Sequence, residues 1–471
     1  MTPSEDNVLR RIPSVESLLQ DESLSEWIGT APRALVAECV RGAADEVRRQ
    51  LLGGQGGPDA QGDLRRLVLR KAQELLRAAA GPYYRKAVNA TGIVLHTGLG
   101  RAVLAPAAMR QVQAELAGYS VLQLDVETGA RSRRDARIEW LLQRLTGAEA
   151  ATVVNNNAAA TLLALNAVAA GREVIVSRGQ LVEIGGSFRL PEVMAASGAR
   201  MVEVGTTNRT HPRDYENAIT EQTAAILRVH PSNYRIEGFA SEVSLADLES
   251  IAHRRGLVLI DDVGAGALLD LSRFGFHDEP RLQDSVRAGA DVVTCSADKL
   301  IGGPQGGIVL GRARLVEAVR KNPLARALRV DKVTLAALEA TLTLFLDEET
   351  ALREVPCLRM LARTLDELDA QAARIAGELR RRAPDARVEV ADGFSQMGSG
   401  SLPGQDLPTR LVAVGSPALS ADALALALRR HEPPVFARIQ SDQVLIDPRT
   451  LLDGDEAIVI EAASAALAPE R

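Results

Sequence analysis

A single lysine stands where a buried strand is expected to end. The run 292–295 is β-branched and apolar, and Ser296, Asp298, Lys299 and a segment rich in Gly and Pro follow it. An amine in this position is partly desolvated, which lowers its pKa and makes it a candidate for Schiff-base chemistry. The hydroxyl of Ser296, three residues earlier, could bind a phosphate. The alternative is a surface lysine in a glycine-rich turn, which is the commoner situation for a lysine.

Two carboxylates, Asp261 and Asp262, follow a second apolar run at residues 257–260. A carboxylate at the end of a buried strand can form a salt bridge with a protonated pyridine nitrogen, as the usual Asp partner of pyridoxal phosphate does. A helix cap or a metal ligand explains the pair equally well when the segment is taken in isolation.

Three asparagines, Asn155, Asn156 and Asn157, follow the run 152–154 and begin an apolar helix that extends to Ala170. Asn is a good N-cap, and the small residues after it would let an anion approach the N–H groups of the first turn. The pattern therefore predicts either a phosphate site or a plain helix cap.

Arginines occur in two further segments. Arg101 ends the glycine-punctuated loop 96–101, and Pro323 is expected to begin a helix that carries Arg326 and Arg329. Residues three apart project from one face of a helix, and guanidinium groups bind a tetrahedral oxyanion better than lysines do. The alternative is a pair of surface salt bridges.

Short β-branched runs that alternate with helical stretches must position these residues; they are 152–154, 173–177, 201–204, 225–229, 257–260, 291–294 and 307–310. The alternation predicts an α/β fold whose mainly parallel sheet is covered by helices, with ligands beyond the carboxyl ends of the strands. An anion site, then an Asp, then Ser-x-x-Lys is the order of the aspartate-aminotransferase-like (fold type I) pyridoxal-phosphate enzymes, which this chain resembles.

Three domains are expected in 471 residues. Residues 1–80 are predicted to be helical, with one amphipathic helix at 32–52. Residues 81–345 form the catalytic domain, and residues 346–471 a small α+β domain with a long helix at 360–382 and strands at 411–414 and 435–439. The segment 33–86 holds 11 Lys and Arg against 6 Asp and Glu. This basic surface fits either a phosphate backbone or an ordinary solvated face, such as an oligomerisation element.

The net charge of −6 argues against a general nucleic-acid binder. Three widely separated cysteines without metal-ligand spacing fit a reducing compartment and give no metal site. The chain shows neither an apolar signal core nor a run long enough to span a membrane, so a soluble cytoplasmic protein is expected.

Longer motifs occur along nearly the whole chain, at residues 88–97, 153–158, 177–179, 183–189, 204–210, 298–305 and 326–332. They resemble the bacterial selenocysteine synthase family, the L-seryl-tRNA(Sec) selenium transferases. The resemblance implies a transferase that converts seryl-tRNA(Sec) to selenocysteinyl-tRNA(Sec) with selenophosphate, through an aminoacrylate formed with pyridoxal phosphate, for selenoprotein biosynthesis. It also implies a homo-oligomer, a ring of dimers that would be a decamer.

The resemblance also implies roles for the candidate residues. Lys299 would be the Schiff-base lysine and Asp262 the partner of the pyridine nitrogen, with Asp261 held in reserve. The selenophosphate would be bound by Arg101, Arg326 and Arg329, with Arg101 supplied by a neighbouring subunit. From the residue pattern itself, Ser296, Asn155, Asn156 and Asn157 are expected to bind the cofactor phosphate. Either His230 or Asp298 is expected to protonate the hydroxyl leaving group.

Two residues depart from the family pattern: Gly98 stands where Asn is expected, and Gln180 where Glu is expected. One rival function is that of a pyridoxal-phosphate lyase acting on a free amino acid or amino sugar acid. Another is a non-catalytic tRNA-binding protein on this fold. The basic N-terminal segment argues against the first rival, and the intact Lys299 and Asp262 argue against the second.

Overall fold

The computed structural model describes residues 12–53, 64–186, 188–402 and 404–468. The chain forms two compact units, Met1–Lys86 and Ala87–Arg471, which we describe separately. No helix in the described ranges is long and apolar enough to cross a membrane.

The first unit is helical. It contains α2 (Val15–Leu19), η1 (Glu22–Leu24), α3 (Ser25–Thr30), α4 (Arg33–Leu52) and α5 (Leu64–Ala80), and α4 packs against α5. The helix predicted at 32–52 is confirmed, with Pro32 as its N-cap. Its apolar positions, including Val36, Val40 and Val47, are buried against α5, while Arg41 and Arg49 are exposed.

The second unit is organised around a seven-stranded sheet in which every predicted β-run of the catalytic segment has its place. Only β10 is antiparallel to its neighbours, and the other strands are parallel. The order is β2 (Ala150–Val154), β10 (Gly307–Gly311), β9 (Val292–Ser296), β8 (Val258–Gly264), β7 (Thr223–Val229), β3 (Glu173–Ser177) and β6 (Arg200–Val204). The fold is that of the fold type I pyridoxal-phosphate enzymes.

Helices cover both faces of this sheet, because successive strand residues alternate between two cores. Val293 packs with α7 (Ala136–Thr146) and α15 (Lys332–Leu344). Its neighbour Val292 packs with α8 (Asn157–Ala169) and α13 (Ala313–Lys321). Burial on both faces explains why these strands read as continuous apolar runs.

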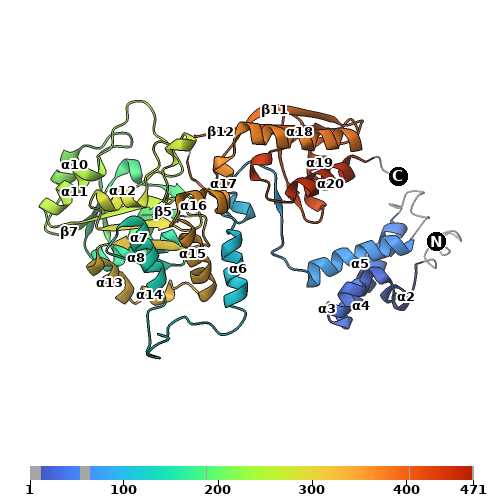
Figure 1. Cartoon of the computed structure of the whole chain (residues 1–471), viewed down its shortest axis with the longest axis horizontal. Coiled ribbons are helices and arrows are strands. Elements are labelled where there is room, and N and C mark those ends of the chain that lie inside the picture. Colours follow the sequence, from blue (N-terminus) through green and yellow to red (C-terminus); the bar gives the residue numbers. More distant parts are fainter. Residues whose placement is uncertain (1–11, 54–63, 187, 403, 469–471) are drawn as a thin grey trace. The chain divides into compact units, whose positions relative to one another are not determined.

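The C-terminal part of the second unit is an antiparallel sheet in the order β11 (Arg387–Ser395), β12 (Leu407–Gly415), β15 (Gln443–Ile446) and β14 (Arg438–Gln440). Helix α18 (Leu365–Arg382) lies along β11 and β12 (Figure 1), and α19 (Ala421–Arg430) and α20 (Asp455–Leu467) complete this core.

The long helix predicted at roughly 360–382 is confirmed as α18, but it begins at Leu365 and not at Met360. Helix α17 (Pro356–Ala362) ends first, and α18 starts anew because Thr364 and Glu367 form a capping box.

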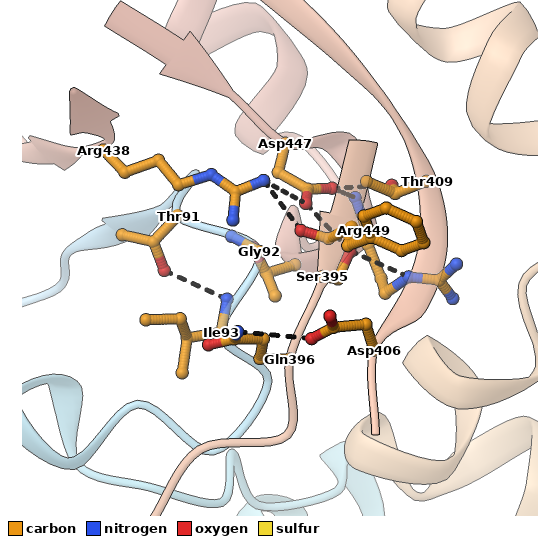
Figure 2. Close-up of polar contacts among 12 residues, drawn as sticks. Thr91, Gly92, Ile93, Ser395, Gln396, Asp406, Thr409, Arg438, Asp447 and Arg449 are labelled. Atoms are coloured by element: carbon orange, nitrogen blue, oxygen red, sulfur yellow. Dashed lines mark hydrogen bonds and ion pairs between the residues drawn. The ribbon is translucent and has the colours of Figure 1, made fainter. Parts of the chain in front are cut away.

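A buried polar cluster joins this C-terminal sheet to the start of the second unit. Asp447 accepts hydrogen bonds from Ser395 Oγ (2.8 Å), Thr409 Oγ1 (2.9 Å) and the N–H of Arg449 (3.0 Å), as Figure 2 shows for its side chains. Gly92 lies directly against it with φ +76°, and a Cβ there would overlap the carboxylate of Asp447. The small β1 (Val88–Asn89) also pairs with β13 (Val435–Phe436).

Backbone hydrogen bonds to the C-terminal sheet continue from Gly92 along the segment that leads to Arg101. The N–H groups of Val94 and Leu95 donate to the carbonyls of Gln396 (2.8 Å) and Met397 (2.7 Å). The segment 92–101 therefore takes its course from the C-terminal sheet, although that sheet lies much later in the chain, at residues 387–446.

Candidate active site

A cavity of about 300 Å³ opens at the carboxyl ends of β7, β8 and β9. Strand ends of a parallel sheet meet at one edge, so the polar residues that follow them converge there. The lining includes Arg101, Asn156, Asn157, His230, Ser232, Asp262, Ser296, Asp298, Lys299 and Gln305, with Val182 and Phe188 as apolar wall.

Lys299 follows β9 and is only 6% exposed. Burial and the positive charge of Arg101 lower the pKa of its amine, whereas Asp298, Asp262 and Glu279 oppose that shift. The turn after it requires glycine, because Gly302 has φ +72° and a Cβ there would overlap Val355. The predicted desolvated lysine at a strand end is thus present in the cavity.

The two carboxylates of β8 point to different surroundings because strand residues alternate. Asp261 is bound by Arg228 Nη1 (2.8 Å) away from the cavity. Asp262 lines the cavity, and its oxygens accept from Asn157 Nδ2 (2.8 Å) and Thr161 Oγ1 (3.0 Å). Burial raises the pKa of Asp262, and these donors counteract the rise. The geometry favours Asp262 over Asp261 as partner of a ligand in the cavity.

The three asparagines do three different things. The N–H of Asn155 donates to the Leu328 carbonyl (3.0 Å), and Asn155 does not line the cavity. Asn156 is the N-cap of α8, since its Oδ1 accepts from Ala159 N–H (2.9 Å). Asn157 holds Asp262, and its buried Oδ1 has no partner within the described residues. The predicted helix cap is thus Asn156, and the polar group that faces the cavity is Asn157.

Arg101 and Asp298 form an ion pair at the mouth of the cavity, with Nη1 to Oδ2 at 2.7 Å. Arg101 has φ +64°, a left-handed conformation that is uncommon for a residue with a side chain and typical of functional sites. The resemblance suggested that a neighbouring subunit supplies Arg101. In this structure its guanidinium reaches Asp298 of the same chain.

Arg326 and Arg329 do not share a helical face, so that prediction is wrong. Helix α14 (Leu324–Ala327) ends before Arg329, because Arg329 forms a β-bridge with Val154. Neither arginine lines the Lys299 cavity; Arg329 lines a second cavity of about 310 Å³ beside β2. Arg134 lies close to both, and burial together with Arg329 lowers the pKa of its guanidinium.

Several site residues escaped the sequence analysis. Thr161 lies one helical turn after Asn157, so their i, i+4 spacing was a usable signal. Thr294 contacts Thr161 (3.3 Å between hydroxyls) from the strand that leads to Lys299. Glu279, on a loop after η5 (Leu271–Phe274), carries no local signal.

The two departures from the family pattern have different settings. Gln180 is buried, and its Oε1 accepts from the N–H of Val229 (3.1 Å), which fixes the strand end that precedes His230. An amide oxygen does this without bringing a charge. Gly98 is exposed, and a Cβ there would meet only the ring of His96.

The residues fit pyridoxal phosphate. An amine of lowered pKa, a buried carboxylate, a hydroxyl at Ser296 and the N-terminus of a 13-residue helix surround one cavity. The unpartnered Oδ1 of Asn157 leaves one acceptor open on the ligand side.

Comparisons with known proteins agree with this geometry. The family model described as L-seryl-tRNA selenium transferase matches residues 87–452, and the one described as selenocysteine synthase N terminal matches residues 9–48. The L-seryl-tRNA(Sec) selenium transferase of Desulfomicrobium baculatum is 48% identical over 463 residues, covering 98% of this chain and 99% of that protein. The one of Solidesulfovibrio magneticus is 48% identical over 471 residues, with the same coverage.

Among solved structures, a D-glucosaminate-6-phosphate ammonia-lyase superimposes with a TM-score of 0.57 at 22% identity, covering 83% of this chain and 98% of that one. At this level of identity the likeness concerns the fold alone.

Proposed function

The chain belongs to the L-seryl-tRNA(Sec) selenium transferase family, and we propose how its residues divide the work of converting seryl-tRNA(Sec) to selenocysteinyl-tRNA(Sec). The observation that carries the proposal is the convergence of Lys299, Asp262 and the N-terminus of α8 on one cavity.

Pyridoxal phosphate, when bound, supplies a ring that takes up electrons from the bonds at the α-carbon of an amino acid. Lys299 binds it through its amine and then moves the proton at the seryl Cα, a role supported by the lowered pKa of this lysine. Asp262 holds a proton at the pyridine nitrogen. Ser296 and the first-turn N–H groups of α8 bind the phosphate, with Asn156 shaping that turn.

We propose selenophosphate as the selenium donor and Arg101, Arg326 and Arg329 as the residues that bind it. Arg101 already stands at the mouth of the cavity, where Asp298 holds it. Arg326 and Arg329 have no carboxylate within ion-pair distance among the residues described, which leaves their charges available to an oxyanion.

The N-terminal unit is proposed to bind the tRNA. Arg33, Arg41, Arg49, Arg70 and Arg77 are exposed and form no ion pair within its described residues. An array of free guanidinium groups suits a phosphate backbone, so binding should weaken steeply with salt.

A homo-oligomer, a ring of dimers, completes the proposal, in a reducing cytoplasm that suits the three free cysteines. The segment between α6 (Pro106–Glu115) and α7 exposes Tyr119, Val121, Leu124 and Val126. Exposed apolar side chains gathered on one segment mark a protein contact. Sedimentation of the intact protein and of a Leu124→Asp variant measures the assembly.

The deciding experiment incubates the protein with serylated tRNA(Sec) and selenophosphate and identifies the amino acid released from the tRNA. Selenocysteine is the expected product. A parallel incubation with free L-serine separates this activity from that of a lyase, which would consume the free amino acid. Serine recovered unchanged from the tRNA would contradict the proposal.

A further inference from the structure

His230 enters the cavity beside a buried carboxylate. It directly follows β7, and its N–H donates to the Asp262 carbonyl (2.9 Å), which fixes the backbone against β8. Its Nε2 lies 3.5 Å from Oε2 of Glu279. Its Nδ1 makes no hydrogen bond within the part of the chain that the structure describes.

Glu279 is a carboxylate in an environment that is unfavourable for it. Its side chain is 2% exposed, and its Oε1 is buried without a partner among the described residues. A buried carboxylate oxygen without a hydrogen-bond partner is unfavourable for folding. No arginine or lysine of the described ranges forms an ion pair with it; its charge acts on Lys299 from farther away, and His230 is the group within ion-pair distance.

Asp298, the other candidate acid, is paired with Arg101. It accepts a charge-assisted hydrogen bond from Arg101 at 2.7 Å. A carboxylate held in this way acts as a hydrogen-bond acceptor and not as a donor. The proton for the leaving hydroxyl must then come from a group that can donate, and His230 lines the same cavity.

We propose that Glu279 is a positioning residue that acts through His230: it holds the Nε2–H, so that Nδ1 gives a proton to the departing seryl hydroxyl. This assignment rests on the proposed function. Lys299 first takes the proton from Cα, and in the following step the electron pair of that C–H bond forms the Cα=Cβ bond. The Cβ–O bond breaks, and the oxygen leaves with its electron pair and the proton from His230, as water.

The test compares two leaving groups on the intact holoenzyme. Hydroxide needs a proton to leave, whereas chloride does not. Glu279→Gln, which keeps the shape and removes the charge, should lower turnover of seryl-tRNA(Sec) on the order of 100-fold. The same variant should process β-chloroalanyl-tRNA(Sec) at the wild-type rate and release tritium from Cα of the seryl group as the wild type does.

Asp278→Asn is the matched control, because Asp278 stands next to Glu279 on the same loop but is exposed and paired with Arg235. It should leave both substrates unaffected. His230→Gln must show the same leaving-group pattern as Glu279→Gln, and the double variant should be no slower than His230→Gln alone.

The assignment is overturned if Glu279→Gln turns over seryl-tRNA(Sec) normally. It is also overturned if both substrates slow equally, since a structural defect does not distinguish leaving groups. If Glu279→Gln does not fold, wild-type activity of His230→Gln on seryl-tRNA(Sec) would still refute it. Failure of the wild type itself to act on seryl-tRNA(Sec) would instead refute the proposed function, and this assignment with it.

Discussion

Two buried polar clusters of the second unit can be compared directly. Around Asp447, most buried polar groups are partnered: its carboxylate takes three hydrogen bonds, and the Arg449 guanidinium donates to Ser395 Oγ and to main-chain carbonyls, while Nε of Arg438 lacks a partner among the described residues. Around Lys299, Asn157 and Glu279 each keep one buried oxygen without a partner in the described ranges. Similar burial thus serves different ends. A cluster whose polar groups are mostly hydrogen-bonded stabilises the fold, whereas buried polar atoms without partners mark a site that can bind a ligand.

The largest expected effect is a loss of catalytic activity when the Lys299 cluster, and not the Asp447 cluster, is altered. Lys299→Ala should lower turnover of seryl-tRNA(Sec) at least about 1,000-fold, because it removes both the cofactor linkage and the base. Its free energy of unfolding should not fall, since a buried amine with a lowered pKa is an unfavourable group to bury. Borohydride reduction should fix pyridoxal phosphate to Lys299 in the wild type. Recovery of the label on another lysine would refute the assignment.

The Asp447 cluster should respond in the opposite way. Asp447→Asn removes the charge that acts on the buried Arg449 and that pairs with Arg438, and it replaces one acceptor oxygen by an amide donor, so it should lower the free energy of unfolding by about 1–3 kcal/mol. Asp442→Asn, an exposed change in the same hairpin, is the control. Urea unfolding measures both. Equal midpoints would show that the cluster contributes nothing.

A smaller effect is expected where the Lys299 cavity is held by hydroxyls. Thr161→Val removes one donor to Asp262 and should weaken pyridoxal phosphate binding about tenfold, since a hydrogen bond to a charged group contributes about 1.5–3 kcal/mol. Thr161→Ser retains the hydroxyl and should bind as the wild type does. Titration of the cofactor by absorbance measures both, and equal loss in the two variants would point to packing instead.

The smallest effect depends on pH and concerns the cofactor-free protein. Folding lowers the pKa of Lys299, so between that value and about 10.4 the unfolded chain binds more protons and stability rises with pH. Lys299→Met removes this dependence. The variant should therefore be more stable than the wild type at low pH, and the difference should narrow as the pH approaches about 10.4. A difference that stays constant across this range would contradict the lowered pKa.

What the sequence revealed was local. The seven β-runs, the lysine after a strand and the cap at Asn156 follow from neighbouring residues, and the structure has them all. The helical placement of Arg329 failed because a bridge to Val154, far away in the chain, decides its backbone. Glu279 and Asp447 were missed for the same reason: an isolated acidic residue becomes informative only when its distant neighbours are known.

The junction at Asp447 also bears on how the protein is made. The N–H of Gly92 donates to Thr450 Oγ1, and that hydroxyl in turn donates to the carbonyl of Asn89, across 358 and 361 residues of chain. Synthesis runs from the N-terminus, and contacts between distant residues form late. A ribosome-bound chain can therefore shape the sheet around Lys299 while the loop leading to Arg101 still lacks its support. The loop that leads to Arg101 gains this support only after residues 396–450 have left the ribosome.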